Sequence, residues 1–229
     1  MTVGGVLADA ARLYVRFFWR SLFVAAAIFI VFTIPAAVVD TLRDTRLTIL
    51  IATLLVTLFT SYGDFLLEGA LAVDIKQHRE VGVVPGLRAL LRRTRPHLLT
   101  LLAATLVYSV SIVVGLVLLV VPGLIVLVRW SVIVPVIVIE GRGMRDAFRR
   151  SNQLVQGHSW TVLWILLIIF IVAGLLETWF DNLLHPLLPE FFSSWLGHFL
   201  VSVITAPYAA HALAVIYFRL VENERSRSS

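Results

Sequence analysis

Residues 97–140 read HLLTLLAATLVYSVSIVVGLVLLVVPGLIVLVRWSVIVPVIVIE, and this stretch decides the fold class. Between residues 98 and 139 the only Lys, Arg, Asp or Glu is Arg129. A helix needs roughly 20 apolar residues to cross a hydrocarbon core of about 30 Å, so the stretch is long enough to cross twice. At its centre lies Val121-Pro122-Gly123, where proline suits a first helical position and glycine permits a tight turn. The stretch therefore predicts a close antiparallel hairpin of two membrane spans.

The chain as a whole is also strongly apolar. It is 59% hydrophobic and 14% charged with a mean hydropathy of +0.94, whereas soluble domains are about 45–50% apolar and about 25% charged. We therefore predict an all-α, polytopic membrane protein with one domain over 1–220 and a short tail over 221–229. The six predicted spans lie near 21–39, 47–73, 97–120, 122–140, 159–179 and 195–219.

The first apolar run, 21–39, follows three arginines, an arrangement that also precedes the core of a secretory signal. Its 19 residues exceed the roughly 7–15 of a signal core, so we expect an uncleaved first span.

The distribution of Lys and Arg predicts the orientation of the spans, because cytoplasmic segments hold these residues in excess. One side would carry Arg12, Arg16 and Arg20, then Lys76, Arg79, Arg88, Arg92, Arg93 and Arg95, then Arg142, Arg145, Arg149 and Arg150, and finally Arg219, Arg225 and Arg227. The other side would carry Arg43 and Arg46 alone. Both termini are therefore predicted to be cytoplasmic.

Three basic segments on that side each combine an apolar and a basic helical face, and each precedes a pair of spans. The apolar positions are Val6, Ala10, Leu13 and Phe17 in the first, Leu87, Leu90, Leu91 and Leu98 in the second, and Met144, Ala147, Phe148 and Val155 in the third. Their order suggests a threefold pseudo-repeat of amphipathic helix plus hairpin. One interpretation is that these segments only orient the spans. The other is that they bind anionic headgroups through Arg88, Arg92, Arg93, Arg95, Arg145, Arg149 and Arg150.

Four titratable side chains fall inside the predicted spans: Asp64, Glu68, Arg129 and His211. Such residues are expensive in a membrane and tend to face protein or water. Counting from the cytoplasmic ends of the spans places Asp64, Arg129 and His211 at similar depths, so the sequence predicts an intramembrane polar cluster with an ion pair between Asp64 and Arg129. A structural ion pair is one reading of this cluster, and a transport or catalytic role is another.

Pro135 and Pro207 lie inside the fourth and sixth predicted spans. Each removes a backbone donor and is expected to kink its helix.

Motifs of other chemistries are missing from the sequence. It has no phosphate-binding loop, nucleophile elbow, zinc-protease motif or dinucleotide fingerprint, and no cysteine. Its histidines do not pair at metal-ligand spacing. We therefore expect no enzyme activity, no cofactor and no metal. Nucleic acid is not an expected partner either, because its binding would need a basic surface presented away from the membrane.

Part of the sequence resembles a known family. The residues that carry the resemblance are Pro122-Gly123-Leu124, Arg129, Pro135, Glu140, Gly143, Ala147, Arg150-Ser151, Leu154 and Gly157, with the ending Pro207-Tyr208 and Tyr217-Phe218-Arg219-Leu220. This pattern is similar to the membrane domain of glycerophosphodiester phosphodiesterases and its stand-alone relatives. Asn152 departs from the aromatic residue that usually follows the Arg-Ser pair. In fused relatives catalysis belongs to a separate soluble barrel, and only nine residues follow Leu220 here.

The resemblance implies a component of the bacterial cytoplasmic membrane. We expect a non-enzymatic scaffold or accessory module, related to lipids or the envelope, with anionic membrane lipids and a membrane protein as its partners. The alternative is a transporter or channel subunit that uses the polar cluster.

Overall fold

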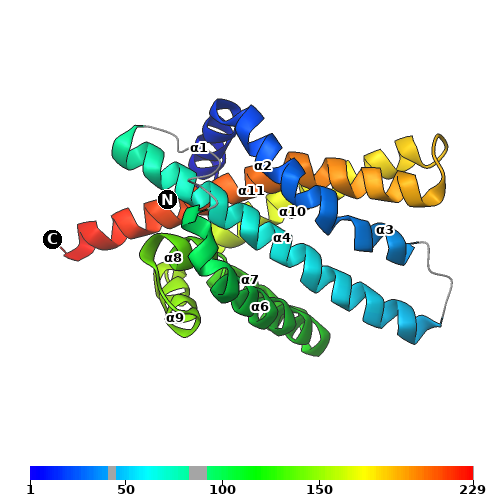
Figure 1. Cartoon of the computed structure of the whole chain (residues 1–229). Coiled ribbons are helices and arrows are strands. Elements are labelled where there is room, and N and C mark those ends of the chain that lie inside the picture. The colour runs from blue at the N-terminus through cyan, green and yellow to red at the C-terminus, as the bar shows by residue number, and fades with distance from the viewer. Residues whose placement is uncertain (41–44, 83–91, 229) are drawn as a thin grey trace.

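The computed structural model describes residues 1–40, 45–82 and 92–228, and every regular element that these residues form is a helix (Figure 1). Six of the helical segments are long and apolar enough to cross a membrane, as the sequence predicts. They cover Phe18–Val39, Arg46–Val81, Arg92–Gly115, Val120–Glu140, Ser159–Leu184 and Glu190–Ser226.

The N-terminal region contains three helices. Helix α1 (Val3–Arg16) is followed by α2 (Phe18–Phe32) and α3 (Ile34–Asp40), and the last two form the first span. They are separated at Thr33, two residues before Pro35, which lacks the N–H that a continuous helix would use. The Thr33 hydroxyl donates to the carbonyl of Phe29 at 2.7 Å and so stabilises the last turn of α2.

Helix α4 (Arg46–Val81) forms the second span without interruption. The Thr45 hydroxyl accepts a hydrogen bond from the Thr48 N–H at its start. Gly82 ends it with a φ of +71°, a conformation that glycine adopts without steric cost.

The predicted hairpin of the third and fourth spans is present. A short 3₁₀ turn, η1 (Arg95–His97), leads into α6 (Leu98–Leu118), which packs closely on α7 (Val120–Arg129). The chain reverses at Leu119, so the Pro-Gly pair lies in the first turn of α7 and not in the reversal itself. Gly115 of α6 is needed for this close packing, because a Cβ added there would lie 2.8 Å from the Cα of Gly123.

The fourth span is divided. Helix α7 ends at Arg129, and α8 (Ile133–Glu140) begins after the non-helical residues 130–132. The division lies just before Pro135, where the sequence predicts a kink. By contrast, α11 continues through Pro207 without a break.

The last three helices are α9 (Met144–Val155), α10 (Ser159–Leu184) and α11 (Glu190–Ser228). Residues 221–228 of the predicted tail extend α11, and Glu222 and Glu224 pair there with arginines of other helices. Residues 180–184 belong to α10 and residues 190–194 to α11.

Helix α11 lies at the centre of the fold, since it packs against α1, α2, α3, α4 and α10. Its buried side chains include His211, Ala214 and Ile216. Helix α1 lies directly on it: the Tyr208 hydroxyl donates to the carbonyl of Leu7 at 3.3 Å, and Arg219 forms an ion pair with Asp9. The first basic segment is therefore held by protein contacts.

Several ion pairs join the helices at one end of the bundle, which we call the basic end. Arg79 of α4 pairs with Glu222 at 3.1 Å. Arg150 of α9 makes two hydrogen bonds to Glu224, at 2.6 and 2.5 Å, and a third to Glu140 at 3.3 Å. Both chain termini lie toward this end (Figure 1).

Candidate functional site

A cavity of about 430 Å³ lies inside the bundle, between the second, third, fourth, fifth and sixth spans. Its walls are mainly apolar, with contributions from Phe65, Ile112, Ile169 and Leu213. It lies near the middle of α6 and of α10, because Tyr108 and Phe170 both line it. The polar residues that line it are Thr57, Ser61, Asp64, Glu68, Tyr108, Ser109, Trp130, Ser131, Ser202 and Thr205.

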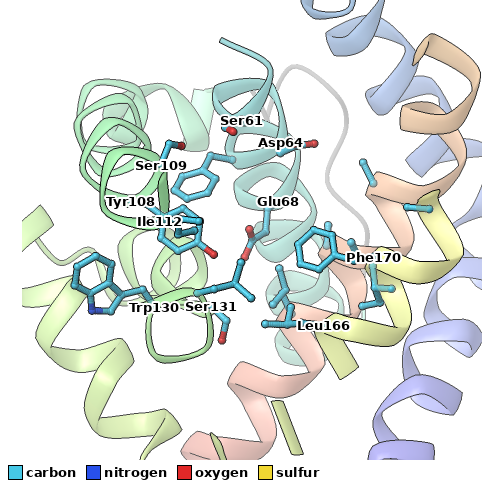
Figure 2. A pocket seen from close by; sticks show the side chains of 18 of the residues that line it. Ser61, Asp64, Glu68, Tyr108, Ser109, Ile112, Trp130, Ser131, Leu166 and Phe170 are labelled. Carbon is cyan, nitrogen blue, oxygen red and sulfur yellow. The ribbon is translucent and has the colours of Figure 1, made fainter. Parts of the chain in front are cut away.

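Glu68 is the most buried charged residue of this cavity, with 7% of its surface exposed. Figure 2 shows its carboxylate pointing into the space between Tyr108 and Phe170. Its Oε1 atom has no hydrogen-bond partner among the described residues. It also forms no ion pair with any Lys or Arg that the structure describes. The cavity thus contains a buried carboxylate without a counter-charge.

Asp64 lies one helical turn before Glu68 on α4 and lines the same cavity. Its side chain is more exposed than that of Glu68, and in Figure 2 it points away from the centre of the cavity. Two carboxylates on one cavity wall repel any anion and attract any cation.

The interruption of the fourth span supplies another polar group. Ser131 lies between α7 and α8, and its hydroxyl oxygen is buried without a hydrogen-bond partner among the described residues. Tyr108 of α6 lines the cavity beside it and packs against Phe65, with ring centroids 5.4 Å apart. Sequence analysis did not select Ser131 or Tyr108. The only signal in the sequence was that Pro135 frees the carbonyl of Ser131.

The predicted ion pair between Asp64 and Arg129 does not form. Asp64 lines the central cavity, whereas Arg129 is exposed in a separate groove beside Phe148 and Arg149 of α9. Counting residues compares depth along a helix axis but not the direction around it. Arg129 ends α7, and its side chain reaches α9 and not α4.

His211 does not join the cluster either. It is buried on a different side of α11, where its Nε2 lies 3.4 Å from the Ser21 hydroxyl of α2. The rings of Tyr14 and Phe17 approach it edge-on at 6.2 and 6.4 Å. His211 thus packs α11 against the N-terminal helices, and only Asp64 and Glu68 of the four predicted residues share a site.

The basic residues assigned to lipid headgroups fall into different environments. Arg145 and Arg149 are exposed on α9, as are Arg92, Arg93 and Arg95 before α6. Arg88 and the leucines of its segment from 83 to 91 lie outside the described residues. Arg150 is not on the exposed face of α9, because it turns inward to Glu140 and Glu224, which raises the pKa of its guanidinium.

No group of three or more His, Asp or Glu within the described ranges is arranged to hold a metal ion.

Comparison with known proteins gives one match. Residues 65–221, more than half of the chain, match the family described as Domain of unknown function (DUF7847). The chain belongs to the DUF7847 family. The matched region begins in α4 and ends in α11, so it includes Glu68 and most of the cavity wall. No curated protein matches the chain. No solved structure matches it either.

Proposed function

We propose that this member of the DUF7847 family binds a small organic cation in its central cavity and acts as a transporter or channel subunit. The observation that carries the proposal is the buried Glu68 carboxylate, which lacks a counter-charge among the described residues. An unpaired charge taken out of water typically costs several kcal/mol. A cationic ligand next to Glu68 would offset this cost.

The walls of the cavity favour an organic cation with apolar substituents. Pockets that bind small molecules measure about 300–1,000 Å³ and are mostly apolar with a few polar groups. This cavity, at about 430 Å³, lies within that range. Phe65, Phe170 and Tyr108 can contact apolar substituents while Glu68 binds the charge. Aromatic faces also attract organic cations.

The division of the fourth span supports a ligand site at this level. Irregular backbone within a membrane is tolerated where protein buries it or where it lines a cavity. Substrate sites of many transporters lie near the bilayer midplane beside interrupted helices. Residues 130–132 interrupt the fourth span, and Trp130 and Ser131 both line the cavity.

The test uses two probes of the same shape and opposite charge, tetraphenylphosphonium and tetraphenylborate. Binding to the full chain in nanodiscs is measured by equilibrium dialysis, and uptake by empty nanodiscs is subtracted. We expect net binding of the cation only, with about tenfold weaker affinity after Glu68→Gln, equivalent to about 1.4 kcal/mol. Glu80→Gln, near the exposed end of the same helix, is the matched control and should bind like the wild type. Equal net binding of both probes, or equal effects of the two substitutions, would contradict the proposal.

The second candidate is a lipid- or envelope-related scaffold without enzymatic activity. It is supported by the exposed Arg92, Arg93 and Arg95 and by α9, which buries Ala147 and exposes Arg145. Each basic residue near an anionic surface adds about 1 kcal/mol of attraction. Replacement of Arg88, Arg92, Arg93 and Arg95 by Gln should lower the anionic lipid retained on purification. Unchanged lipid content would argue against this role.

In either role we infer a multi-pass protein of the bacterial cytoplasmic membrane with its basic end in the cytoplasm. The six apolar helices support a membrane location, and the excess of Arg at the basic end supports the orientation. The bacterial assignment follows from the resemblance to the membrane domain of glycerophosphodiester phosphodiesterases, whereas binding of an organic cation does not depend on that resemblance.

A further inference from the structure

A second concave surface lies between α7 and α9, outside the central cavity. This groove has a volume of about 400 Å³ and is lined by Ile125, Val126, Arg129, Trp130, Phe148, Arg149 and Asn152. Among the described residues, Trp130 alone lines both this groove and the central cavity. The groove therefore presents different chemistry, with two arginines where the cavity has two carboxylates.

Contacts between the two helices hold the groove in shape. The Ser151 hydroxyl of α9 donates to the carbonyl of Arg129 at 2.9 Å, and Ser151 is fully buried. The rings of Trp130 and Phe148 meet edge-on with their centroids 4.5 Å apart. Because both contacts join the end of α7 to α9, they keep Arg129 and Arg149 on the same groove.

The two arginines of the groove differ from Arg142 and Arg150 in having no carboxylate partner among the described residues. Arg142 pairs with Glu140 at 2.5 Å, and Arg150 pairs with Glu140 and Glu224. Neither Arg129 nor Arg149 forms an ion pair with any described residue, and both are exposed. Asn152 adds a polar side chain one turn after Phe148. The groove thus offers positive charge and hydrogen-bond donors without an internal partner.

An apolar surface continues from these arginines along α7. Ile125, one turn before Arg129, is 46% exposed, and Val121, one turn earlier, is 64% exposed. Val117 and Leu118 at the end of α6 are also exposed. A ligand with its anionic group at Arg129 and Arg149 could therefore place an extended hydrocarbon chain along Ile125 and Val121. The arginines followed by an apolar surface complement the phosphate group and the acyl chain of a phospholipid, which are arranged in the same order.

We propose that the groove between α7 and α9 binds one anionic phospholipid, with Arg129 and Arg149 on its phosphate group and an acyl chain along Ile125 and Val121. Arginine suits this role because its planar guanidinium makes paired hydrogen bonds to phosphate oxygens. An arginine can also lay its aliphatic stem along apolar surface while its charged group reaches a more polar region. This site gives a role to Arg129, an exposed arginine at the end of an apolar helix whose predicted ion pair with Asp64 does not form.

The test measures lipid binding to the full purified chain by native mass spectrometry in detergent. Phosphatidylglycerol is titrated against phosphatidylcholine of the same acyl composition. We expect one tightly bound phosphatidylglycerol, and about tenfold weaker binding in Arg129→Gln and in Arg149→Gln. Arg145→Gln is the matched control, because Arg145 is exposed on the same helix but does not line the groove. Arg129→Lys, which keeps the charge, should retain part of the preference.

Three outcomes would overturn the proposal. Equal binding of the two lipids would show that charge is not recognised. An effect of Arg145→Gln as large as that of Arg149→Gln would indicate a diffuse basic surface and no discrete site. Displacement of phosphatidylglycerol by an equal concentration of inorganic phosphate would show that the acyl chain is not bound. Retention of the lipid under that challenge supports the site, and circular dichroism checks that each variant keeps its helices.

Discussion

Arg20 of α2 and Asp74 of α4 form a two-point ion pair: Arg20 Nε donates to Asp74 Oδ2 at 2.6 Å, and Nη2 donates to Oδ1 at 3.0 Å. The Asp74 side chain is only 6% exposed, and that of Arg20 is 26% exposed. This pair joins the first span to the second near the basic end, and it is the kind of link that the sequence led us to expect between Asp64 and Arg129.

Replacement of one member of this pair should destabilise the protein more than replacement of both. Arg20→Leu leaves the Asp74 carboxylate buried without its partner, at a cost of about 3 kcal/mol, the lower end for buried pairs because Arg20 is partly exposed. The double variant with Asp74→Leu removes the stranded charge and should be more stable than the single one. Unfolding in detergent, followed by tryptophan fluorescence, measures the coupling. Arg12→Leu is the control, since Arg12 is highly exposed, and strictly additive losses would contradict the coupling.

The hairpin of α6 and α7 should not tolerate a side chain at Gly115. A Cβ there would lie 2.8 Å from the Gly123 Cα and 2.9 Å from its nitrogen, so the two backbones would have to separate. We expect Gly115→Ala to destabilise the fold by about 1–3 kcal/mol, the usual range for overpacking. Thermal unfolding in detergent provides the measurement.

Gly174→Ala is the matched control for this substitution, because Gly174 lies in another span helix with nothing within 4 Å of its added Cβ. Its stability should be unchanged or slightly raised, since alanine is the better helix former. Equal losses in both variants would mean that α6 and α7 do not pack at this glycine contact.

The central cavity should be accessible to water. The chain has no cysteine, so single cysteines can be introduced without background labelling. Ser61→Cys and Thr205→Cys place thiols on the cavity wall, and Ser21→Cys places one in packed protein beside His211. We expect a membrane-impermeant maleimide to label the first two at least about tenfold faster, because the reaction requires a hydrated thiolate. Equal, slow labelling at all three positions would indicate a dry cavity and would favour the scaffold role.

The orientation of the spans can be tested with reporters. A reporter fused after Ser229 should be active as a cytoplasmic one, and a reporter inserted at His185, between α10 and α11, as an extracytoplasmic one. The reason is the excess of Arg at the basic end. Cytoplasmic signals at both positions would contradict the six-span arrangement, whereas reversed signals at both would contradict the orientation alone.

The sequence alone was sufficient to predict the number, the approximate limits and the helical character of the six segments that are long and apolar enough to cross a membrane. Each span has to satisfy its own backbone hydrogen bonds and match the thickness of the membrane, and both requirements act on local runs of apolar residues. The hairpin around Gly123 and the break before Pro135 follow from the same local rules. The threefold pseudo-repeat stays a prediction, since part of its second basic segment, including Leu87, Leu90 and Leu91, lies outside the described residues.

Only the tertiary structure decided which polar side chains meet. Counting residues along the sequence places Asp64, Arg129 and His211 at similar depths, but contact depends also on the rotation of each helix about its axis and on its neighbours. Apolar packing around α11 sets those rotations, and small residues allow some pairs of helices to approach more closely than others. It turns Glu68 toward Tyr108 and Ser131, Arg129 toward Arg149, and His211 toward Ser21. Counting residues along the sequence gives the depth of a side chain along its helix, whereas the packing of the helices decides the direction in which that side chain points.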